Sequence, residues 1–254
     1  MEAALKEEIQ IFPDLESLSH KAAAIFIGTA KESIAENGRF SVVISGGSTP
    51  ARLFSVLCAD YRSEAVWEDT HFFWADERCV PIENKESNFG NAYRLLLSKI
   101  PVHTKNIHRI RGEDDPEKEA LRYETEIRDY FGRENPAVFD LVILGMGDDG
   151  HTASLFPGSK SVNETERFAI AVDTDRLKSR RITLTLAVIN KARHILFLVS
   201  GISKSNALAE IQGESKTKKM YPAGLVNPVS GAVNWLVDEE AAIKLRERNT
   251  GKNC

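Results

Sequence analysis

The stretch from Asp140 to Gly158 constrains the fold more than any other part of the chain, and it reads D-L-V-I-L-G-M-G-D-D-G-H-T-A-S-L-F-P-G. It begins with an unbroken apolar run at 141–144, which is typical of a strand buried on both faces of a parallel sheet. Three glycines within six residues follow, together with Asp149 and then His151. Glycine lets the backbone turn sharply and lets a ligand approach it closely. Because ligands of open α/β sheets bind beyond the carboxyl ends of the strands, this loop predicts a functional site more than a plain turn.

A second glycine loop follows the β-rich run 40–44 and precedes a helical pattern at 51–57. The motif between them, S-G-G-S-T-P at 45–50, places Pro50 in the first turn of the helix, where proline is favoured. Free amides at the positive end of a helix favour a bound phosphate, although a capped turn without a ligand is the alternative. The motif is neither a Walker loop nor a dinucleotide fingerprint, so no nucleotide is indicated. The residues expected at the phosphate are Gly46, Gly47, Ser48 and Thr49, of which one hydroxyl residue is expected to cap the helix.

The remaining chain alternates strand-like and helix-like segments. The expected strands span 9–12, 40–44, 70–74, 107–110, 141–144, 168–172, 180–186, 194–199 and 233–237. The expected helices span 14–36, 51–57, 93–97, 116–131, 203–211 and 239–247, with Asp14 and Ser87 as N-caps and a mostly solvated charged face on 116–131. This alternation predicts an α/β fold with a doubly wound, mostly parallel sheet, formed by one domain over residues 1–254.

Charged residues follow the strand expected at 70–74, in the sequence D-E-R at 76–78. This position brings Asp76 and Arg78 to the same sheet edge as the two glycine loops, although exposed ion pairs are the alternative. Two further cations are candidates for that edge. Arg181 opens a strand, and Lys204 lies in the first turn of a helix after a glycine. Solvated cations are the alternative for this pair, because charged side chains are mostly exposed.

Composition narrows the possible partners and compartment. The formal net charge is −4 and no basic stripe is present, so we expect no nucleic-acid partner. Three scattered cysteines show neither disulfide nor zinc spacing, which favours a reducing compartment. The first ten residues are too charged for a signal peptide, and no apolar run has membrane-spanning length. We therefore expect a cytoplasmic protein without a membrane partner, in which the K-T-K-K run at 216–219 forms a mobile basic loop.

Six motifs occur in an order that is similar to one known family. They are S-G-G-S-T-P at 45–50, D-E-R-C-V-P at 76–81, S-N-F-G at 87–90, G-M-G-D-D-G-H-T-A-S-L-F-P-G at 145–158, R-I-T-L-T-L at 181–186 and N-W-L-V-D-E-E-A-A at 234–242. Over nearly the whole chain they resemble the glucosamine-6-phosphate isomerase/6-phosphogluconolactonase family, and within it the lactonases of the pentose phosphate pathway. Arg78 stands where the deaminases typically carry an aromatic residue, and T-A-S-L-F-P at 152–157 replaces their I-A-F-N-E-P type sequence. One departure is Ala187, where lactonases often have proline, and it lies outside the presumed chemistry.

The resemblance implies a Rossmann-like fold and hydrolysis of 6-phosphoglucono-1,5-lactone, without a metal or cofactor. A δ-lactone is an activated ester, so its enzyme needs a base for water and stabilisation of an oxyanion. His151 is the expected general base, because histidine titrates near neutral pH. Asp76 is expected to orient His151 or to hold a sugar hydroxyl, and Arg78 to stabilise negative charge or contact phosphate. The resemblance assigns Arg181 and Lys204 to the phosphate, and a monomer or weak homodimer is expected.

Two other functions remain open at this point. A sugar-phosphate isomerase or deaminase needs a base that takes a proton from carbon, and either Asp76 or Asp149 could serve. A non-catalytic sugar-phosphate sensor would need the phosphate loop but not His151, and usually carries a fused module that is not visible here. The chain also lacks a G-x-S-x-G elbow and catalytic-zinc spacing, which argues against a serine hydrolase and a zinc hydrolase.

Overall fold

A computed structural model describes residues 7–173, 179–213 and 218–251 of the protein. Its centre is a seven-stranded sheet in which every neighbouring pair of strands is parallel, in the order β1-β10-β9-β6-β2-β3-β5. The strands are β1 (Glu7–Phe12), β2 (Phe40–Ile44), β3 (Thr70–Trp74), β5 (Ile107–His108), β6 (Leu141–Gly145), β9 (His194–Val199) and β10 (Ala232–Asp238). The predicted Rossmann-like α/β fold is therefore confirmed.

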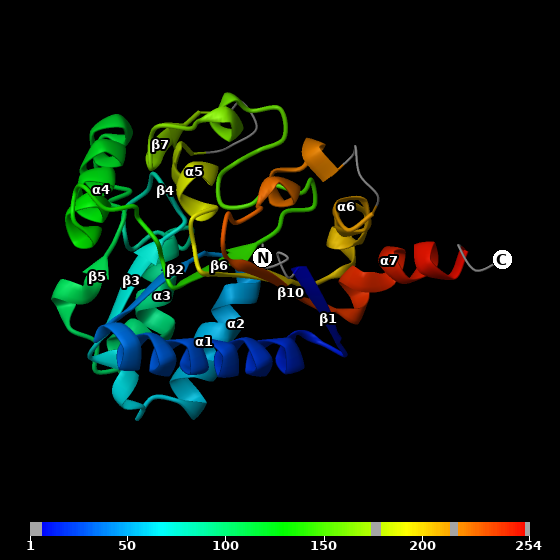
Figure 1. Cartoon of the computed structure of the whole chain (residues 1–254), viewed down its shortest axis with the longest axis horizontal. Helices are drawn as coiled ribbons and strands as arrows, with labels where there is room; N and C mark the ends of the chain where they lie inside the picture. The colour runs from blue at the N-terminus through cyan, green and yellow to red at the C-terminus, as the bar shows by residue number, and fades with distance from the viewer. Residues whose placement is uncertain (1–6, 174–178, 214–217, 252–254) are drawn as a thin grey trace.

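Helices cover both faces of this sheet. In Figure 1, α1 and α2 lie below it, whereas α6 and the strand β7 lie above it. The helices are α1 (Leu15–Asn37), α2 (Ser48–Asp60), α3 (Asn88–Leu95), α4 (Pro116–Phe131), α5 (Leu186–Ile189), α6 (Ser205–Ile211) and α7 (Glu239–Gly251). The N-caps predicted at Asp14 and Ser87 are confirmed, since each side chain accepts a backbone N–H of its helix. The hydroxyl cap predicted for α2 is wrong: Gly47 is the N-cap and no side chain caps the helix.

A second, antiparallel sheet was not anticipated. It contains β4 (Asp76–Arg78), β8 (Arg181–Leu184) and β7 (Ala169–Val172), in the order β4-β8-β7. The sequence predicts strands at two of these places, but a strand pattern does not name its partner. The small sheet joins the large one just after β3, where the Leu184 N–H donates to the Ala75 carbonyl at 2.7 Å. It brings residues 76–78 beside residues 181–183, which are about a hundred positions further along the chain.

The charged face of α4 is only partly solvated, which corrects the prediction. Glu119 and Glu124 are 2% and 8% exposed. Glu119 contacts Arg122 on its own helix, and Glu124 contacts Arg167 at 2.6 Å, just before β7. The helix thus packs against the small sheet through paired charges, and a buried carboxylate in that place needs such partners.

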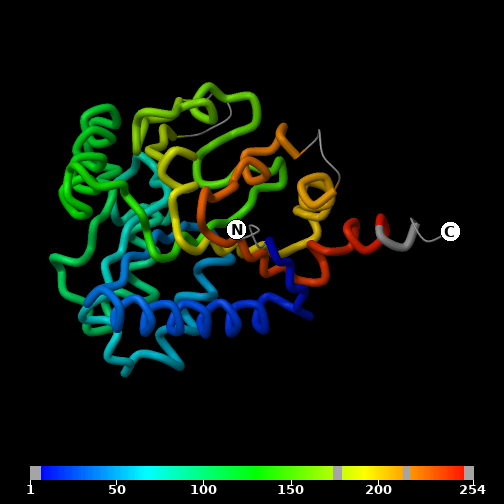
Figure 2. Tube along the Cα trace, in the orientation of Figure 1, coloured from blue at the N-terminus to red at the C-terminus, as the bar shows by residue number. Residues whose placement is uncertain are grey.

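Residues 218–225 pack against the loop that carries His151. Figure 2 shows this orange segment beside the green one, and the Ala223 N–H donates to the Gly150 carbonyl at 3.0 Å. A Cβ on Gly150, whose φ is +74°, would come within 2.4 Å of the Tyr221 ring, so this contact requires glycine. Of the basic loop predicted at 216–219, the first two residues lie outside the described residues. Lys218 forms an ion pair with Glu7, with 3.0 Å between Nζ and Oε2.

None of the described helices is long and apolar enough to cross a membrane.

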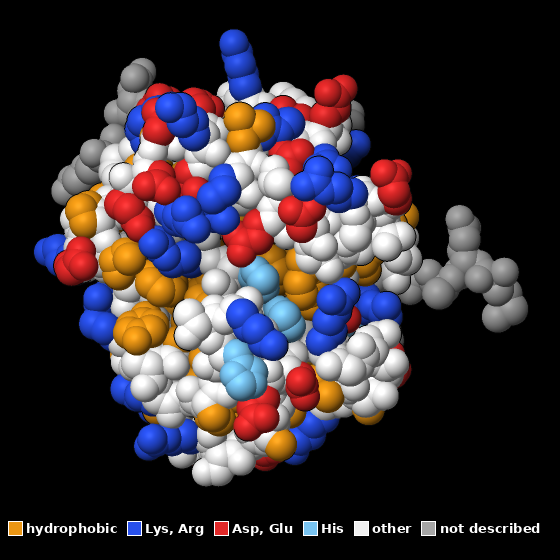
Figure 3. Space-filling view, turned by 90° about the vertical axis from the view of Figure 1, so that its left-hand side faces the viewer, with side chains coloured by type: hydrophobic (Ala, Val, Ile, Leu, Met, Phe, Trp, Pro, Cys, Tyr) orange, Lys and Arg blue, Asp and Glu red, His pale blue; other side chains and the backbone are white. Residues whose placement is uncertain are grey.

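A pair of histidines lies at the β3–β5 edge of the large sheet. Figure 3 faces this side of the molecule and shows histidine side chains gathered beside apolar and basic ones. His71 Nδ1 lies 3.1 Å from His108 Nε2, and His108 Nδ1 lies 2.8 Å from a Glu126 carboxylate oxygen. Burial first, and then the positive charges of His108 and Arg39, lower the pKa of His71 to about 4. His71 is therefore neutral in the folded protein near pH 7.

This pKa predicts how stability responds to acid. The unfolded chain binds a proton at His71 near the ordinary pKa of 6.5, whereas the folded chain binds it only near 4. Stability from neutral His71 is thus fully present above pH 6.5 and is lost as the pH falls toward 4. We expect the melting temperature of His71→Gln to fall less steeply than that of the wild type over this range. The exposed His103 provides the control variant His103→Gln, and equal slopes in all three proteins would contradict the prediction.

Candidate active site

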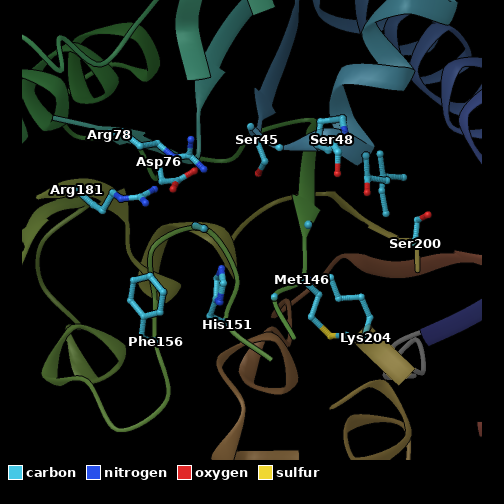
Figure 4. A pocket seen from close by; sticks show the side chains of 18 residues that line it. Ser45, Ser48, Asp76, Arg78, Met146, His151, Phe156, Arg181, Ser200 and Lys204 are labelled. Atoms are coloured by element: carbon cyan, nitrogen blue, oxygen red, sulfur yellow. The ribbon is translucent and has the colours of Figure 1, made fainter. Parts of the chain in front are cut away.

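One cavity collects every residue that the sequence places at the site. It has a volume of about 320 Å³ and lies at the carboxyl ends of β2, β6 and β9, which are neighbours in the sheet. The nine predicted residues that line it are Gly46, Gly47, Ser48, Thr49, Asp76, Arg78, His151, Arg181 and Lys204. Figure 4 shows Asp76, Arg78 and Arg181 at one side, Ser48, Ser200 and Lys204 at the other, and His151 between the two groups.

The loop after β6 holds His151 through its own backbone and through Asp149. The Gly147 N–H donates to the His151 carbonyl at 2.8 Å, and a Cβ on Gly147 would lie 2.1 Å from His151 Nδ1. Position 147 therefore requires glycine, because a side chain there would clash with the His151 ring. Asp149 Oδ1 accepts the His151 backbone N–H at 3.1 Å and lies 2.6 Å from Nδ1 of the ring. A carboxylate can only accept, so it holds the proton on Nδ1 and leaves Nε2 of the neutral ring as the acceptor.

The electrostatics of this pair favour an ionised Asp149. Partial burial acts to raise the pKa of Asp149, but the hydrogen bonds from the His151 backbone and ring outweigh it and leave that pKa lowered. The Phe156 ring lies 4.8 Å from the imidazole, at an angle of 43°, and forms the apolar side of the cavity next to it. Asp149 is thus an anionic partner that fixes the tautomer and direction of His151.

Asp76 does not make the orienting contact that the sequence suggested for it. Its carboxylate is 5% exposed and accepts the Ser154 hydroxyl at 2.6 Å and the Asn88 side-chain amide at 3.1 Å. Asp149 orients His151 instead, and its position two residues before the histidine is the signal that could have indicated this. Asp76 links the β4 strand, helix α3 and the His151 loop to one another.

Other residues missed from the sequence support these loops. Ala153 has a φ of +49°, a left-handed conformation that costs a non-glycine residue roughly 1–2 kcal/mol. Glu77 is buried and accepts the backbone N–H groups of Asn88 and Phe89 at the start of α3. Burial raises the pKa of Glu77 to about 7, and those N–H donors oppose the rise. Within residues 7–173, 179–213 and 218–251, no three His, Cys, Asp or Glu side chains are grouped so that they could hold a metal ion.

Arg78 and Arg181 face each other across the antiparallel pair β4–β8. Arg78 Nη1 donates to the Glu86 carbonyl at 2.6 Å, but the buried Nε atoms of both arginines have no hydrogen-bond partner among the described residues. Burial, and after it the charge of Arg78, lowers the pKa of Arg181. Like charges directly opposite each other are unfavourable in a sheet, so an anionic ligand in the cavity would relieve this arrangement.

The start of α2 supplies backbone donors on the other side. Because the first N–H bonded within the helix is that of Ala51, to the Gly47 carbonyl, the amides of Ser48 and Thr49 lack helical partners. Gly47 has a φ of +107°, which favours glycine. A Cβ on Gly46 would lie 1.7 Å from Asn88 Oδ1, so only glycine fits there. The positive end of α2 and the ammonium group of Lys204 thus border the same cavity.

A parallel sheet with a glycine loop at a helix N-terminus and a histidine loop at adjacent strand ends defines an α/β protein with a site suited to an anionic ligand such as a phosphate. A family model described as glucosamine-6-phosphate isomerases/6-phosphogluconolactonase matches residues 13–235, and the chain belongs to this family.

Individual relatives agree with the lactonase branch of the resemblance. The chain is 36% identical over 243 residues to 6-phosphogluconolactonase of Synechocystis, covering 94% of this chain and 98% of the relative. It is 40% identical over 205 residues to that of Haemophilus influenzae, covering 80% and 86%. The solved 6-phosphogluconolactonase of Trypanosoma cruzi superimposes with a TM-score of 0.85 at 30% identity, covering 96% of this chain and 98% of that one. The resemblance inferred from the six motifs is confirmed.

The Asp149–His151 contact predicts the effect of Asp149→Asn. The amide can donate to Nδ1, which shifts the ring proton to Nε2 and removes the acceptor that faces the cavity. We expect kcat with the lactone substrate proposed below to fall ~10²-fold or more, the range of a lost general base, with little change in KM. The control is Asp148→Asn, since Asp148 is an exposed neighbour on the same loop. Equal activity of the two variants would rule out this orienting role.

Proposed function

We propose that this chain hydrolyses 6-phospho-D-glucono-1,5-lactone to 6-phospho-D-gluconate, the second step of the oxidative pentose phosphate pathway. The observation that carries the proposal is the pair His151–Asp149, in which Asp149 holds the ring and His151 lines the same cavity as the cations and the start of α2. Such a site can bind an anionic sugar phosphate and activate water beside it. The relatives that bear the lactonase name, at 36% and 40% identity, support the same substrate.

The proposed reaction uses His151 twice. Nε2 takes a proton from a water molecule, whose oxygen attacks the lactone carbonyl carbon and forms a tetrahedral oxyanion. As the carbon–oxygen bond of the ring breaks, the imidazolium returns the proton to the departing ring oxygen, which becomes a hydroxyl group. Asp149 stabilises the transient imidazolium, because its pKa is held low and it stays ionised. No covalent bond between enzyme and substrate is needed for an activated ester of this kind.

We assign the substrate phosphate to the 46–49 loop and Lys204 on one side of the cavity, together with Arg181, which reaches into it from the other side. The amides of Ser48 and Thr49 supply donors at the positive end of a helix, and the two cations border the cavity. Arg78 adds positive charge directly beside Arg181, where it can stabilise the oxyanion or the phosphate. The sugar then extends from this loop toward His151 and Asp76, both of which line the cavity.

The deaminase or isomerase alternative fits the geometry less well. Either reaction needs a carboxylate that is free to take a proton from carbon. Asp149 is hydrogen-bonded to His151, and both oxygens of Asp76 accept hydrogen bonds, from Ser154 and Asn88. We further propose that the chain acts in the cytoplasm as one domain and as a monomer or weak homodimer.

His151→Ala tests the general base. General-base catalysis contributes ~10²–10⁴-fold, so kcat should fall by about that factor with little change in KM. His194→Ala is the matched control, since His194 is exposed and opens β9 at the edge opposite the cavity. A folded His151→Ala variant that keeps most of its kcat would contradict the assignment of His151 as the general base.

Lys204→Ala and Arg181→Ala test the phosphate assignment. Loss of one charge-assisted contact should cost roughly 1.5–3 kcal/mol of binding, which is about 10- to 150-fold in KM. We expect this rise with the phosphorylated lactone and little change with unphosphorylated glucono-1,5-lactone. The exposed Lys99 gives the control Lys99→Ala. Equal effects of a variant on the two substrates would remove that residue from the phosphate and place it at the lactone ring.

A further inference from the structure

Asp238 is a buried carboxylate that the proposed chemistry does not use. It is the last residue of β10, within the N-W-L-V-D-E-E-A-A motif, and it is 5% exposed. β10 pairs in parallel with β9, with Val237 beside Val199, so Asp238 lies next to the loop that leaves β9. That loop carries Ser200 and Lys204 into the cavity.

The Asp238 carboxylate holds this loop through several hydrogen bonds. Oδ2 accepts the Ser200 hydroxyl at 2.5 Å and the Gly201 N–H at 3.0 Å. Oδ1 accepts the Ala241 N–H at 2.8 Å, which caps the first turn of α7. Among the described residues Asp238 has no ion-pair partner, so these hydroxyl and amide donors alone compensate for its burial.

The contact with Gly201 reaches Lys204 through one more hydrogen bond. Gly201 has a φ of +97°, and its carbonyl accepts the Lys204 N–H at 3.0 Å. Its N–H is bound to Asp238, so both sides of this turn are fixed. The turn fixes the position of the Lys204 Cα atom. Because the ammonium group lies at the end of a flexible four-carbon chain, the region that it can reach is set by that position.

We propose that Asp238 is a positioning residue for Lys204: its carboxylate fixes the Ser200–Gly201 turn and thereby directs Lys204 into the cavity. The inference rests on the proposed function in that Lys204 is taken to bind substrate. It gives a role to the motif at 234–242, which does not line the cavity. The carboxylate is shared between this turn and the start of α7, so the two roles must be separated by the choice of variant.

The variant Asp238→Ser separates the two roles. Serine is a favoured N-cap and can still accept the Ala241 N–H, but its shorter side chain does not reach the Ser200–Gly201 turn. We expect the KM for the phosphorylated lactone to rise roughly tenfold, kcat to change little, and the KM for unphosphorylated glucono-1,5-lactone to stay the same. Asp238→Asn keeps an acceptor for Gly201, so it should recover most of the wild-type KM.

Asp140→Ser is the matched control. Asp140 is 8% exposed and accepts one backbone N–H and one hydroxyl, both from Ser41, at 2.8 and 2.7 Å, and unlike Asp238 it also has an ion-pair partner, Arg193, at 3.5 Å. It precedes β6 at the opposite ends of the strands from the cavity. Both variants should lower the melting temperature, but only Asp238→Ser should change the ratio of KM values for the two lactones.

The double variant Asp238→Ser/Lys204→Ala decides the proposal. If Asp238 acts through Lys204, the double variant has the KM of Lys204→Ala alone. If the two effects multiply, or if Asp238→Ser changes only stability as Asp140→Ser does, the proposal is wrong. If Lys204→Ala raises KM equally for both lactones, the phosphate assignment is wrong. The positioning role of Asp238 is still supported in that case, provided that the double variant has the KM of Lys204→Ala alone. No effect of Lys204→Ala on either lactone would overturn both.

Discussion

The site depends on the parallel alignment of three neighbouring strands. β6 is hydrogen-bonded to β2 on one side and to β9 on the other, so all three end at one edge of the sheet. Each strand delivers a loop with a different chemical property: free amides after β2, His151 after β6 and Lys204 after β9. Parallel pairing makes this convergence possible, because each crossover connection returns the chain to the amino end of the next strand, so that all three strands run toward the cavity.

Aspartates hold these loops in place. Asp149 holds the ring of His151, Asp76 accepts bonds from Ser154 and Asn88, and Asp238 holds the turn before Lys204. A hydrogen bond to a buried carboxylate is stronger than a neutral one, and removal of one partner leaves a costly unsatisfied group. Asp149 fixes the direction of the His151 ring, Asp238 fixes the turn from which Lys204 enters the cavity, and Asp76 joins the supporting elements to one another. The aspartates therefore position other side chains, and the residues that they position are the ones proposed to contact the substrate.

Glycine, proline and buried apolar runs act locally, so they predicted the two glycine loops and the strands that precede them. The cations that line the cavity, Arg78, Arg181 and Lys204, were instead placed there from their positions beside expected strands and helices and from the family resemblance. Sequence patterns did not predict contacts between distant segments. The antiparallel pairing that brings Arg78 to Arg181 joins two segments about a hundred residues apart, and no periodicity specifies such a partner. Glu124 on α4 looked like part of a solvated face because its partner Arg167 lies on another element. Asp149 lies only two residues before His151 in the sequence, but it is the hydrogen-bond geometry that distinguishes it from Asp76 as the orienting group.

Hydrolysis of a phosphorylated sugar lactone in this cavity is open to a direct assay. The most direct measurement is the rate at which the purified protein consumes freshly generated 6-phosphogluconolactone, compared with the spontaneous rate in the same buffer. Glucosamine-6-phosphate and ribose-5-phosphate serve as parallel substrates. The account predicts turnover of the lactone far above the spontaneous rate, with no deamination or isomerisation of the other two sugar phosphates. A lactone rate equal to the spontaneous one, or turnover of glucosamine-6-phosphate instead, would contradict it.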